Sequence, residues 1–526
     1  MHTENNEQSG NHTIGNLNSC WFTPPVEFKN YSPLKDNVET DVVIVGAGIA
    51  GLSIAYCLSR AGKKVIIVEA GFIGSGETGR TTAQLVTALD KRYYEMEEIF
   101  GKEKTNLIAQ SHKEAIEFVE NTIIKENIDC DFQHVDGYLF AHPTDQKDCL
   151  TKELEAALRA GVNVQAMTTT PGIPHEAASL CFANQAQFHP MKYLNGLCLA
   201  IEKNGGKIYT QTHAKEIDGN GIISSEGYAV KAKHIVVATN APVNDIYAMP
   251  LKQTALRSYV IGATIKKGSL PKAMWWDTGD LNADIKPYHY IRLNSYNEQF
   301  DLLLCGGEDH PVGIQPEQSP YASLEIWTRK RFHIVEIISQ WSGEIMESMD
   351  SIAFIGRSPW HEENVFVVTG DSGIGMTYSS IAGMLIKDLI EGKENKYEKI
   401  YSPSRFTLNS SGTFFKLVKG DMANMLKKWF FTDTKELSEI KQGHAAIVKL
   451  EGEKCGVFRD EKDVLHIVSA ECTHLKCMVV WNNGERSWDC PCHGSRFTYS
   501  GKVIHGPAIS DLPSFSHIEV PNEATT

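Results

Sequence analysis

The sequence lacks an excess of positive charge and a long uninterrupted apolar run. Its 65 Asp and Glu outnumber 51 Lys and Arg, for a formal charge of −14, which argues against electrostatic binding to nucleic acid or anionic membrane. The first twenty residues hold no apolar run, so we expect no signal peptide and a disordered tail over 1–20. The stretch VVIVGAGIAGLSIAYCL is broken by glycines, which favours strand, turn and helix over a membrane span. We therefore expect a cytoplasmic protein.

Cysteine pairing is also absent over most of the chain. Of the 12 cysteines, all but the last four are scattered, as small buried apolar residues usually are. At 526 residues the chain is too long for one compact core, so two or three domains are predicted.

The stretch TDVVIVGAGIAGLSIAYCLSRAGKKVIIVEA predicts a βαβ unit that binds a dinucleotide. Gly46 permits the tight turn, Gly48 lets the backbone approach a pyrophosphate, and Gly51 allows close packing of helix on strand. The helix N-terminus faces the anion, and Glu69 at the end of the second strand is placed to bind a ribose. A glycine-rich turn without a ligand is the alternative, and the motif alone does not separate NAD from FAD.

Four further stretches resemble the D-amino-acid oxidase-like (DAO) family of FAD-dependent oxidoreductases. They are GSGETGRTTAQL, FHPMKYLNGLCLAIEKNGGKIYTQTHAKEI, HIVVATNAP and ENVFVVTGDSGIGMTYSSIAGMLIKDLI. The resemblance implies an α/β, Rossmann-like FAD-binding domain with an inserted mixed-sheet (α+β) substrate domain, and in the family the last turn contacts the isoalloxazine. The FAD contacts it implies are Gly46, Gly48, Gly51, Glu69, Ala70, Thr78, Gly79, Arg80, Thr81, Thr82, Ala83, Ala214, Thr239, Gly370, Gly373, Ile374, Gly375, Met376 and Thr377.

The order of these motifs predicts how the chain is divided. A DAO-like region over 21–400 is followed by a linker over 401–435 and a small all-β domain over 436–526, where short strands alternate with turns. The predicted FAD-binding segments are 40–90, 146–244 and 346–397, and the predicted substrate-domain segments are 91–145 and 245–345.

The substrate-domain segments supply candidates for the reaction. The stretch PYHYIR places alternate side chains on one strand face, and Tyr259, Tyr288, His289 and Arg292 are candidates for contacting substrate. His289 and Arg292 face opposite ways unless the strand bulges, and a solvated strand with a satisfied histidine is the alternative. No catalytic base is assigned, because hydride can pass directly to a flavin.

Near the C-terminus, CTHLKCMVVWNNGERSWDCPCHGSRF carries two Cys–His pairs, Cys472 with His474 and Cys490 with His493. Structural zinc is the alternative for such a quartet. Zinc fingers usually pair Cys with Cys and His with His, whereas each element here has one of each, which favours a Rieske [2Fe–2S] centre. CTHLKC and CPCHGSRF also resemble the two boxes of the Rieske family.

This resemblance implies further roles and two departures. Cys477 and Cys492 stand where high-potential members carry a disulfide, which is unusual in a cytoplasm, and Ser495 matches the donor to a bridging sulfide. Lys476 replaces a usual Gly. Phe497 replaces a Tyr that donates to a cysteine sulfur, which predicts a lowered potential unless Tyr499 supplies that bond.

Together these features predict an FAD-dependent dehydrogenase or oxidase acting on a C–N bond of an amine or amino acid. Electrons would pass singly to its own Rieske cluster and then to an external acceptor. A reductase with reversed flow, and a non-catalytic redox-sensing or interaction protein, are the alternatives. A Rieske oxygenase is disfavoured because its mononuclear iron needs two His and a carboxylate, and few residues follow His493.

Overall fold

The computed structural model describes residues 19–146, 148–173, 178–241, 252–282, 287–314, 316, 318–359, 362–406 and 436–515. The predicted tail up to residue 18 and the predicted linker from residue 407 lie outside these ranges, as does the chain beyond residue 515. Residues 19 and 20 of the predicted tail are described, and the first turn is η1 (Cys20–Phe22), whose Trp21 side chain is buried. Within the described ranges, no helix has both the length and the apolar character needed to cross a membrane.

The first sheet is built around the predicted βαβ unit. Its strand order is β16-β17-β10-β1-β2-β7, with β8 and β9 paired beside β10, and β1 runs parallel to both β2 and β10. The central strands are continuous runs rich in β-branched residues, because both faces of this sheet are covered by other parts of the chain. The strands are β1 (Val38–Val45), β2 (Val65–Val68), β7 (Lys207–Tyr209), β8 (Ala214–Asp218), β9 (Gly221–Ser224), β10 (Ala229–Val237), β16 (Phe354–Arg357) and β17 (Val365–Thr369).

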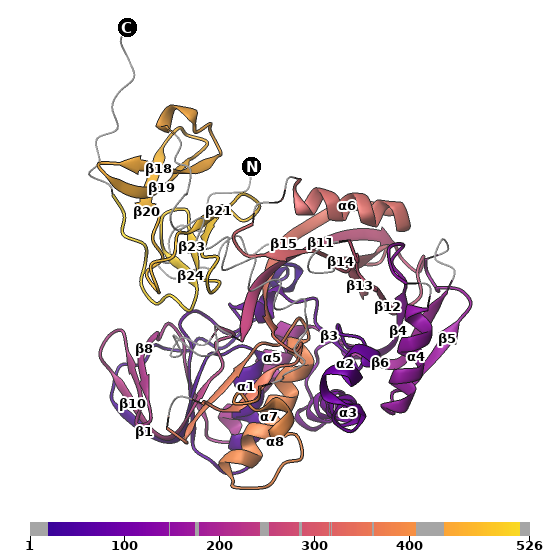
Figure 1. Cartoon of the computed structure of the whole chain (residues 1–526). Coiled ribbons are helices and arrows are strands. Elements are labelled where there is room, and N and C mark those ends of the chain that lie inside the picture. Colours follow the sequence, from indigo (N-terminus) through magenta and orange to yellow (C-terminus); the bar gives the residue numbers. More distant parts are fainter. Residues whose placement is uncertain are drawn as a thin grey trace.

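Helices pack on this sheet and on one another. Helix α1 packs against α5 and α7, and α3 packs against α7, as the lower half of Figure 1 shows. We expected residues 91–145 to belong to the substrate domain, but the longest element among them is α3, whose apolar face joins the core that contains the helices of the first sheet. The helices are α1 (Ile49–Arg60), α3 (Lys102–Glu126), α5 (Pro190–Lys203), α7 (Gly375–Ile390) and α8 (Glu398–Tyr401).

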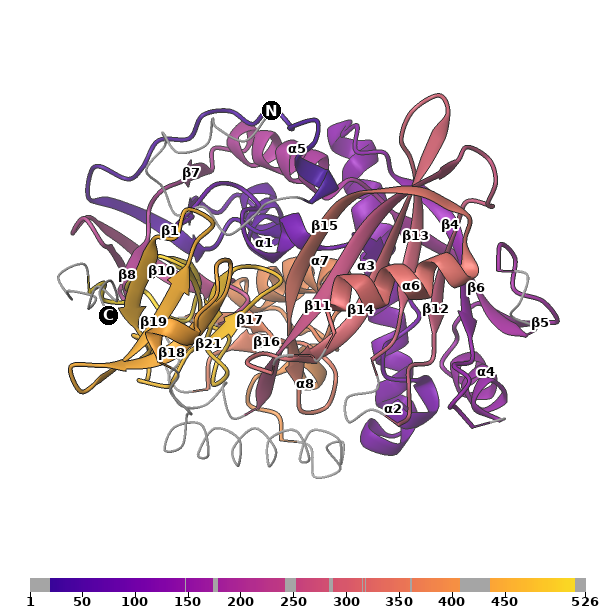
Figure 2. The ribbon, with the colours of Figure 1, turned by 90° about the horizontal axis from the view of Figure 1, so that it is seen from above.

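The second sheet is mixed, as expected for an inserted domain, and has the order β15-β11-β14-β13-β12-β4-β6-β3 with β5 beside β6. Helix α6 (Pro320–Arg331) lies across β11 and β14 (Figures 1 and 2). The strands are β3 (Gln84–Leu85), β4 (Gln133–Phe140), β5 (Val164–Met167), β6 (Ser179–Gln187), β11 (Gln253–Lys266), β12 (Ala273–Asp277), β13 (Tyr290–Ser295), β14 (Phe300–Pro311) and β15 (Ile334–Ser348).

The predicted boundary at residue 145 is wrong. Strands β5 and β6 lie beyond it and pair within the second sheet, and α4 (Cys149–Arg159) packs on α2 (Tyr93–Phe100) and β5. The chain returns to the first sheet's helices only at α5. The sequence of β6 does not show which sheet it joins, because strand pairing depends on distant partners and not on local pattern alone.

The C-terminal domain consists of short antiparallel strands, as predicted. One sheet has the order β18-β19-β20 and the other β21-β22-β23-β24, preceded by η4 (Leu437–Glu439). The strands are β18 (Ala445–Leu450), β19 (Glu453–Arg459), β20 (Leu465–Ser469), β21 (Val480–Asn482), β22 (Ser487–Asp489), β23 (Arg496–Thr498) and β24 (Val503–His505).

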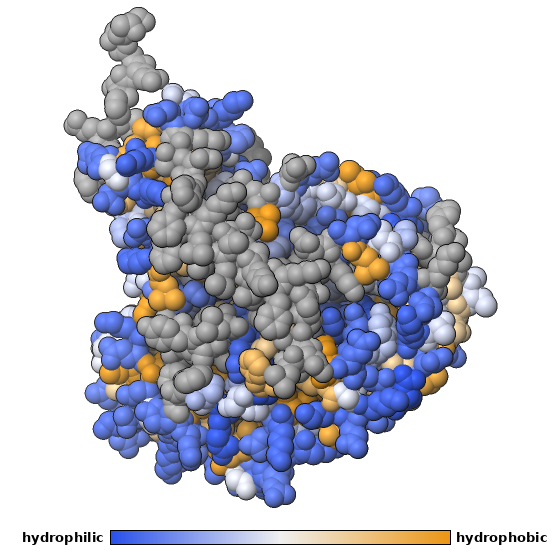
Figure 3. Space-filling model, in the orientation of Figure 1, coloured by the Kyte–Doolittle hydropathy of each residue, from blue (hydrophilic) through white to orange (hydrophobic). Residues whose placement is uncertain are grey.

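This domain stands on the rest of the molecule near the ends of β11 and β15 (Figure 1). The face of the molecule in Figure 3 is largely hydrophilic, with scattered apolar residues. Strands β23 and β24 are the part of the domain turned toward the first two sheets (Figure 1), and the contacts described below bury this junction.

Candidate functional site

A cavity of about 600 Å³ lies where the two large sheets meet the C-terminal domain. One end is formed by the turn between β1 and α1, and another by the turn between β17 and α7 together with Tyr288 and Tyr290. The third wall comes from the C-terminal domain, through residues 503–506, Ala508 and Ile509. The cavity is therefore shared by all three parts of the fold.

The turn between β1 and α1 has the geometry predicted for a phosphate-binding loop. Gly46 has φ +105°, and a Cβ on it would collide with the Ala238 carbonyl oxygen, so only glycine fits. A Cβ on Gly48 would meet only Thr78 Oγ1, at 3.1 Å, among the described atoms around it. A Cβ on Gly51 would collide with the Gly46 carbonyl, which explains the close packing of α1 on β1.

The predicted FAD contacts divide into two groups by position. Those that line the cavity are Gly46, Gly48, Glu69, Ala70, Thr78, Arg80, Thr81, Thr82, Ala214, Thr239, Gly373, Ile374, Gly375 and Met376. The structure places Gly51, Gly79, Ala83, Gly370 and Thr377 behind this lining, where Gly51 packs on Gly46 and Thr377 Oγ1 accepts from Val86 N at 3.3 Å. The two carboxylate oxygens of Glu69 accept from Ala47 N and Gly71 N, at 2.7 and 2.8 Å.

The catalytic candidates Tyr259, His289 and Arg292 are not among the lining residues of this cavity. The Tyr259 hydroxyl bonds His310 Nε2 at 3.0 Å beneath the C-terminal domain. His289 Nδ1 lies 2.8 Å from Asp277 Oδ2, and its ring stacks on Trp327. Arg292 Nη1 donates to the carbonyl oxygens of residues 82, 83 and 188, which ties β13 to the neighbouring loops. Tyr288, the fourth candidate, does line the cavity.

Several lining residues carried no local sequence signal. Asp90 Oδ2 accepts from the Tyr288 hydroxyl at 2.7 Å, and burial raises the pKa of Asp90 to about 6. The Tyr290 hydroxyl pairs with Ser258 Oγ at 2.7 Å, and Trp276 Nε1 donates to Gln84 Oε1 at 3.0 Å. These residues come from distant segments, so only their strand pairing could have identified them.

The four predicted metal ligands converge in the C-terminal domain. The rings of His474 and His493 have centroids 5.0 Å apart, and Nδ1 of each is buried without a hydrogen-bond partner among the described residues. Cys472 and Cys490 are buried and adjacent, and the hydrogen bond between them lowers the pKa of Cys472 to about 7. Two thiols and two unpartnered imidazole nitrogens fit the donor set of a Rieske cluster.

The loops that carry these ligands are joined by a disulfide between Cys477 and Cys492, as the resemblance implied. Lys476 is exposed and has φ +61°, a backbone conformation that favours the glycine usual at this place. Phe497 is fully buried in the core cluster that contains Cys472 and Cys490. The Tyr499 ring instead packs against Phe458 and His466.

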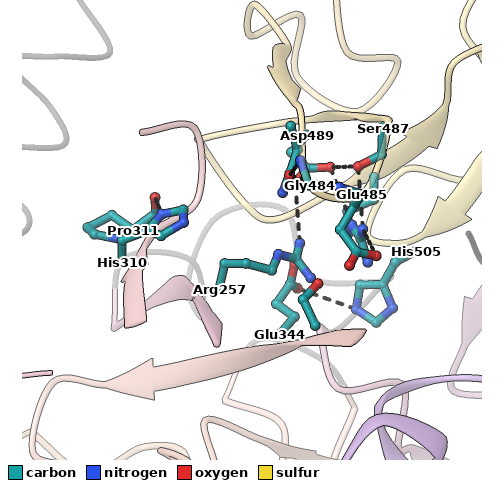
Figure 4. Close-up of polar contacts among 12 residues, drawn as sticks. Arg257, His310, Pro311, Glu344, Gly484, Glu485, Ser487, Asp489 and His505 are labelled. Carbon is teal, nitrogen blue, oxygen red and sulfur yellow. Dashed lines mark hydrogen bonds and ion pairs between the residues drawn. The ribbon is translucent and has the colours of Figure 1, made fainter. Parts of the chain in front are cut away.

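A buried ionic network joins the C-terminal domain to the rest of the chain (Figure 4). Arg257 on β11 lies 3.2 Å from Glu344 and 3.5 Å from Asp489, with the Arg257 side chain fully buried. The Tyr321 hydroxyl donates to Glu485 at 2.8 Å across the same junction. The network contains three arginines and four carboxyl groups, namely Arg80, Arg257, Arg496, Glu77, Glu344, Glu485 and Asp489.

The charges of this network balance when one carboxyl group is protonated. Burial raises the pKa of Glu344 to about 8, because its desolvation outweighs the attraction of Arg257. Burial would also raise the pKa of Glu485, but Arg496 and the other arginines outweigh it and lower that pKa. Burial lowers the pKa of His505 to about 4, and His505 Nε2 lies 3.5 Å from Glu344 Oε1.

Comparison with known proteins identifies both regions. Residues 41–389 match the family model described as FAD dependent oxidoreductase (DAO), and residues 430–516 match the Rieske [2Fe-2S] domain. The chain is 33% identical over 500 residues to the protein named Rieske 2Fe-2S iron-sulfur protein YhfW of Bacillus subtilis (strain 168), covering 94% of this chain and 96% of that protein. It is 25% identical over 390 residues to gamma-glutamylputrescine oxidoreductase of Escherichia coli (strain K12), covering 71% and 88%.

Solved structures show the same fold in the larger region. Glycine oxidase from Geobacillus kaustophilus aligns with a TM-score of 0.59 at 20% identity, covering 70% of this chain and 100% of that one. L-amino acid deaminase from Proteus vulgaris aligns with a TM-score of 0.55 at 19% identity, covering 72% and 100%. The chain belongs to the DAO family of FAD-dependent oxidoreductases and carries a Rieske [2Fe–2S] domain at its C-terminal side.

Proposed function

We propose that this enzyme oxidises a C–N bond of a small amine or amino acid, and that the electrons pass singly through its Rieske cluster to an external acceptor. Bound FAD accepts two electrons as a hydride, and a [2Fe–2S] cluster carries one at a time. In this proposal the cavity residues position the substrate, and the junction between the domains fixes the cluster site beside the cavity.

The observation that carries this proposal is the shared wall between the two cofactor regions. Ala508 lines the cavity, and its backbone N–H donates to Ser495 Oγ at 2.9 Å. The Ser495 side chain lies close enough to Cys472 to contribute to lowering the pKa of that thiol. A single serine therefore connects a proposed cluster ligand to the cavity lining, which favours transfer within one chain over two unrelated activities.

We assign the ligands on this geometry. Cys472, His474, Cys490 and His493 hold the cluster. FAD is held by the glycine turn at Gly46 and Gly48, by Glu69, and by the backbone of the turn that opens α7. The N–H groups at the N-terminus of α7 point into the cavity at Gly375 and Met376. The helix dipole favours negative charge there by about 0.3–1 kcal/mol.

Anaerobic mixing of the holoenzyme with a panel of amines and amino acids tests the function. We expect one class to bleach the flavin absorbance, followed by the electron paramagnetic resonance signal of a reduced cluster. If a chemical reductant of the cluster bleaches the flavin while no panel member does, the flow runs in reverse. If neither route reduces the flavin, a redox-sensing role replaces the enzymatic one.

His493→Ala tests the ligand assignment. The unmodified protein, reduced with dithionite, should show the low average g value of a cluster with half histidine ligation. The variant should lose or shift that signal yet retain FAD, because His493 is not a cavity-lining residue. Metal analysis that finds one zinc and no iron or sulfide per chain would overturn the assignment in favour of structural zinc.

Phe497→Tyr tests the tuning of the cluster. A hydroxyl donor at this buried position would stabilise the more negative reduced cluster, and a charge-assisted hydrogen bond contributes about 1.5–3 kcal/mol. Because 59 mV corresponds to a tenfold change for one electron, we expect the potential to rise by roughly several tens of millivolts. Protein-film voltammetry measures it, with Tyr499→Phe as the control, and an unmoved midpoint in Phe497→Tyr would show that position 497 does not reach a ligand sulfur.

A further inference from the structure

We propose that Asp90 binds the substrate's ammonium group, and that the substrate is an amine without a carboxylate next to the reacting carbon. This inference rests on the proposed function and names the substrate class of the same cavity. Asp90 precedes α2 and lines the cavity beside the turn that opens α7, where a Cβ on Gly373 would lie 2.7 Å from Asp90 Oδ2. The carboxylate therefore lies beside the turn that opens α7.

Asp90 is held in place by one hydrogen bond, from the Tyr288 hydroxyl at 2.7 Å. Of the other acids that line the cavity, Glu226 is exposed, and the remaining four have partners within the protein. Asp371 accepts a backbone hydrogen bond from Gly373, Glu69 accepts two backbone N–H groups, and Glu77 and Glu344 belong to the ionic network. Asp90 is thus the carboxylate beside the turn that opens α7 that can still pair with a cationic ligand.

The cation that the described lining of the cavity contains already belongs to the ionic network. Among the described residues that line the cavity, Arg80 is the only arginine or lysine. Its side chain is 1% exposed, and its Nη1 donates to the Ser342 carbonyl at 2.9 Å and lies 3.7 Å from Glu485. Its Nε and Nη2 are buried without a hydrogen-bond partner among the described residues, but its charge is compensated by the carboxyl groups of that network. A carboxylate near Asp90 would be repelled and left unpaired, which is costly in a desolvated site.

The aromatic lining also suits a cation. Tyr288 and Tyr290 lie with ring centroids 5.6 Å apart, and Trp276 and Tyr378 line the same cavity. Aromatic faces attract ammonium groups, and more strongly when water is excluded. The cavity therefore places the Asp90 carboxylate beside several aromatic rings, which is the chemistry that recognises an alkylammonium ion.

The residues also account for the proton released in the reaction. A substrate R–CH2–NH3⁺ that becomes R–CH=NH2⁺ loses one proton and one hydride. The hydride, with both electrons of the C–H bond, goes to FAD. The Asp90 carboxylate takes the proton from nitrogen and becomes a neutral carboxylic acid, which solvent later deprotonates.

Protonation of Asp90 sets the pH dependence. Its folded-state pKa is raised to about 6, so its negative charge, and with it cation binding, is present above that pH and lost as pH falls through it. The charged and titratable groups around it are Lys91, Arg92, Tyr288, Tyr290, Asp309, Glu347, Asp371 and Tyr378.

Two ligands with the same tert-butyl group and opposite charges test the binding preference. They are the tert-butylammonium ion and 2,2-dimethylpropanoate, and neither has a hydrogen on the carbon that carries the charged group. Titration of the holoenzyme at pH 8, followed by the flavin difference spectrum and by calorimetry, should show binding of the cation and at least tenfold weaker binding of the anion. Cation binding should weaken at least tenfold in Asp90→Asn, and Asp41→Asn, which removes a surface charge at Lys233, should leave it unchanged.

The outcomes separate this inference from the proposed function. Tighter binding of the anion, or an unchanged dissociation constant in Asp90→Asn with full FAD content, would overturn the assignment even if amines reduce the flavin. Selective cation binding that depends on Asp90, without flavin reduction by any amine, would support the ammonium site and reject C–N oxidation. Tyr288→Phe provides a milder variant, expected to weaken cation binding severalfold by loosening Asp90.

Discussion

Gly48→Val is expected to give a folded protein that lacks FAD but keeps the visible absorbance of its iron–sulfur cluster. The Cβ of the new valine would lie 3.1 Å from Thr78 Oγ1. Its side chain would enter the cavity and occupy the path of the pyrophosphate. The proposed cluster ligands lie in the C-terminal domain, whose separate core contains Cys472 and Cys490, so iron and sulfide should stay stoichiometric. Absorbance spectra with flavin and iron quantification measure both.

Gly51→Ala is the contrasting variant. Its Cβ would collide with the Gly46 carbonyl inside the protein and not in the cavity, so it should reduce the yield of folded protein and with it both cofactors. Stoichiometric FAD in Gly48→Val would show that the β1–α1 turn does not hold the dinucleotide.

Arg257→Ala is expected to lower the free energy of unfolding by about 3 kcal/mol, because removing one cation from a buried ion pair is costly and leaves the buried Asp489 carboxylate paired with Arg496 alone among the described residues. Arg257 is fully buried, and it is the cation that reaches both Glu344 and Asp489 across the domain junction. Denaturant unfolding followed by the cluster absorbance measures the loss. Transfer of electrons from flavin to cluster should slow in parallel, since the junction then loosens.

Arg329→Ala is the matched control for charge removal. Arg329 pairs with Glu325 on exposed α6, and exposed pairs contribute only about 0.2–1 kcal/mol. Equal losses in the two variants would mean that the junction network does not stabilise the docked domain. Arginines lower the pKa of Glu485 and Asp489, so their contribution is present above about pH 4 and lost as pH falls further.

The parts of the site that lie close together in sequence were predictable. Gly46, Gly48 and Gly51 fix the β1–α1 turn by their spacing, and the two Cys–His elements identify the cluster loops with no information about the rest of the fold. The disulfide of Cys477 with Cys492 followed from the Rieske resemblance. In each case the chemistry depends on a backbone shape or ligand order encoded within a few residues.

The parts built from distant segments were not predictable. Arg257 and Asp489 are separated by 232 positions, and nothing local in either strand shows that they meet. Tyr288 and His289 are neighbours in sequence, yet only Tyr288 faces the cavity, because its position at the entry of β13 places successive side chains on opposite sides. Asp90 belongs to no sequence motif, and a hydrogen bond from the Tyr288 hydroxyl holds it in position.

The third wall of the cavity has a consequence for dioxygen. Residues 503–506, Ala508 and Ile509 close the cavity on the side of the C-terminal domain. A chain shortened before residue 436 would expose that side to bulk water, and it would leave Arg80 and Arg257 without Glu485 and Asp489. We expect a reduced flavin in such a shortened chain to react faster with dissolved oxygen than in the full chain, which stopped-flow reoxidation of the two proteins would measure.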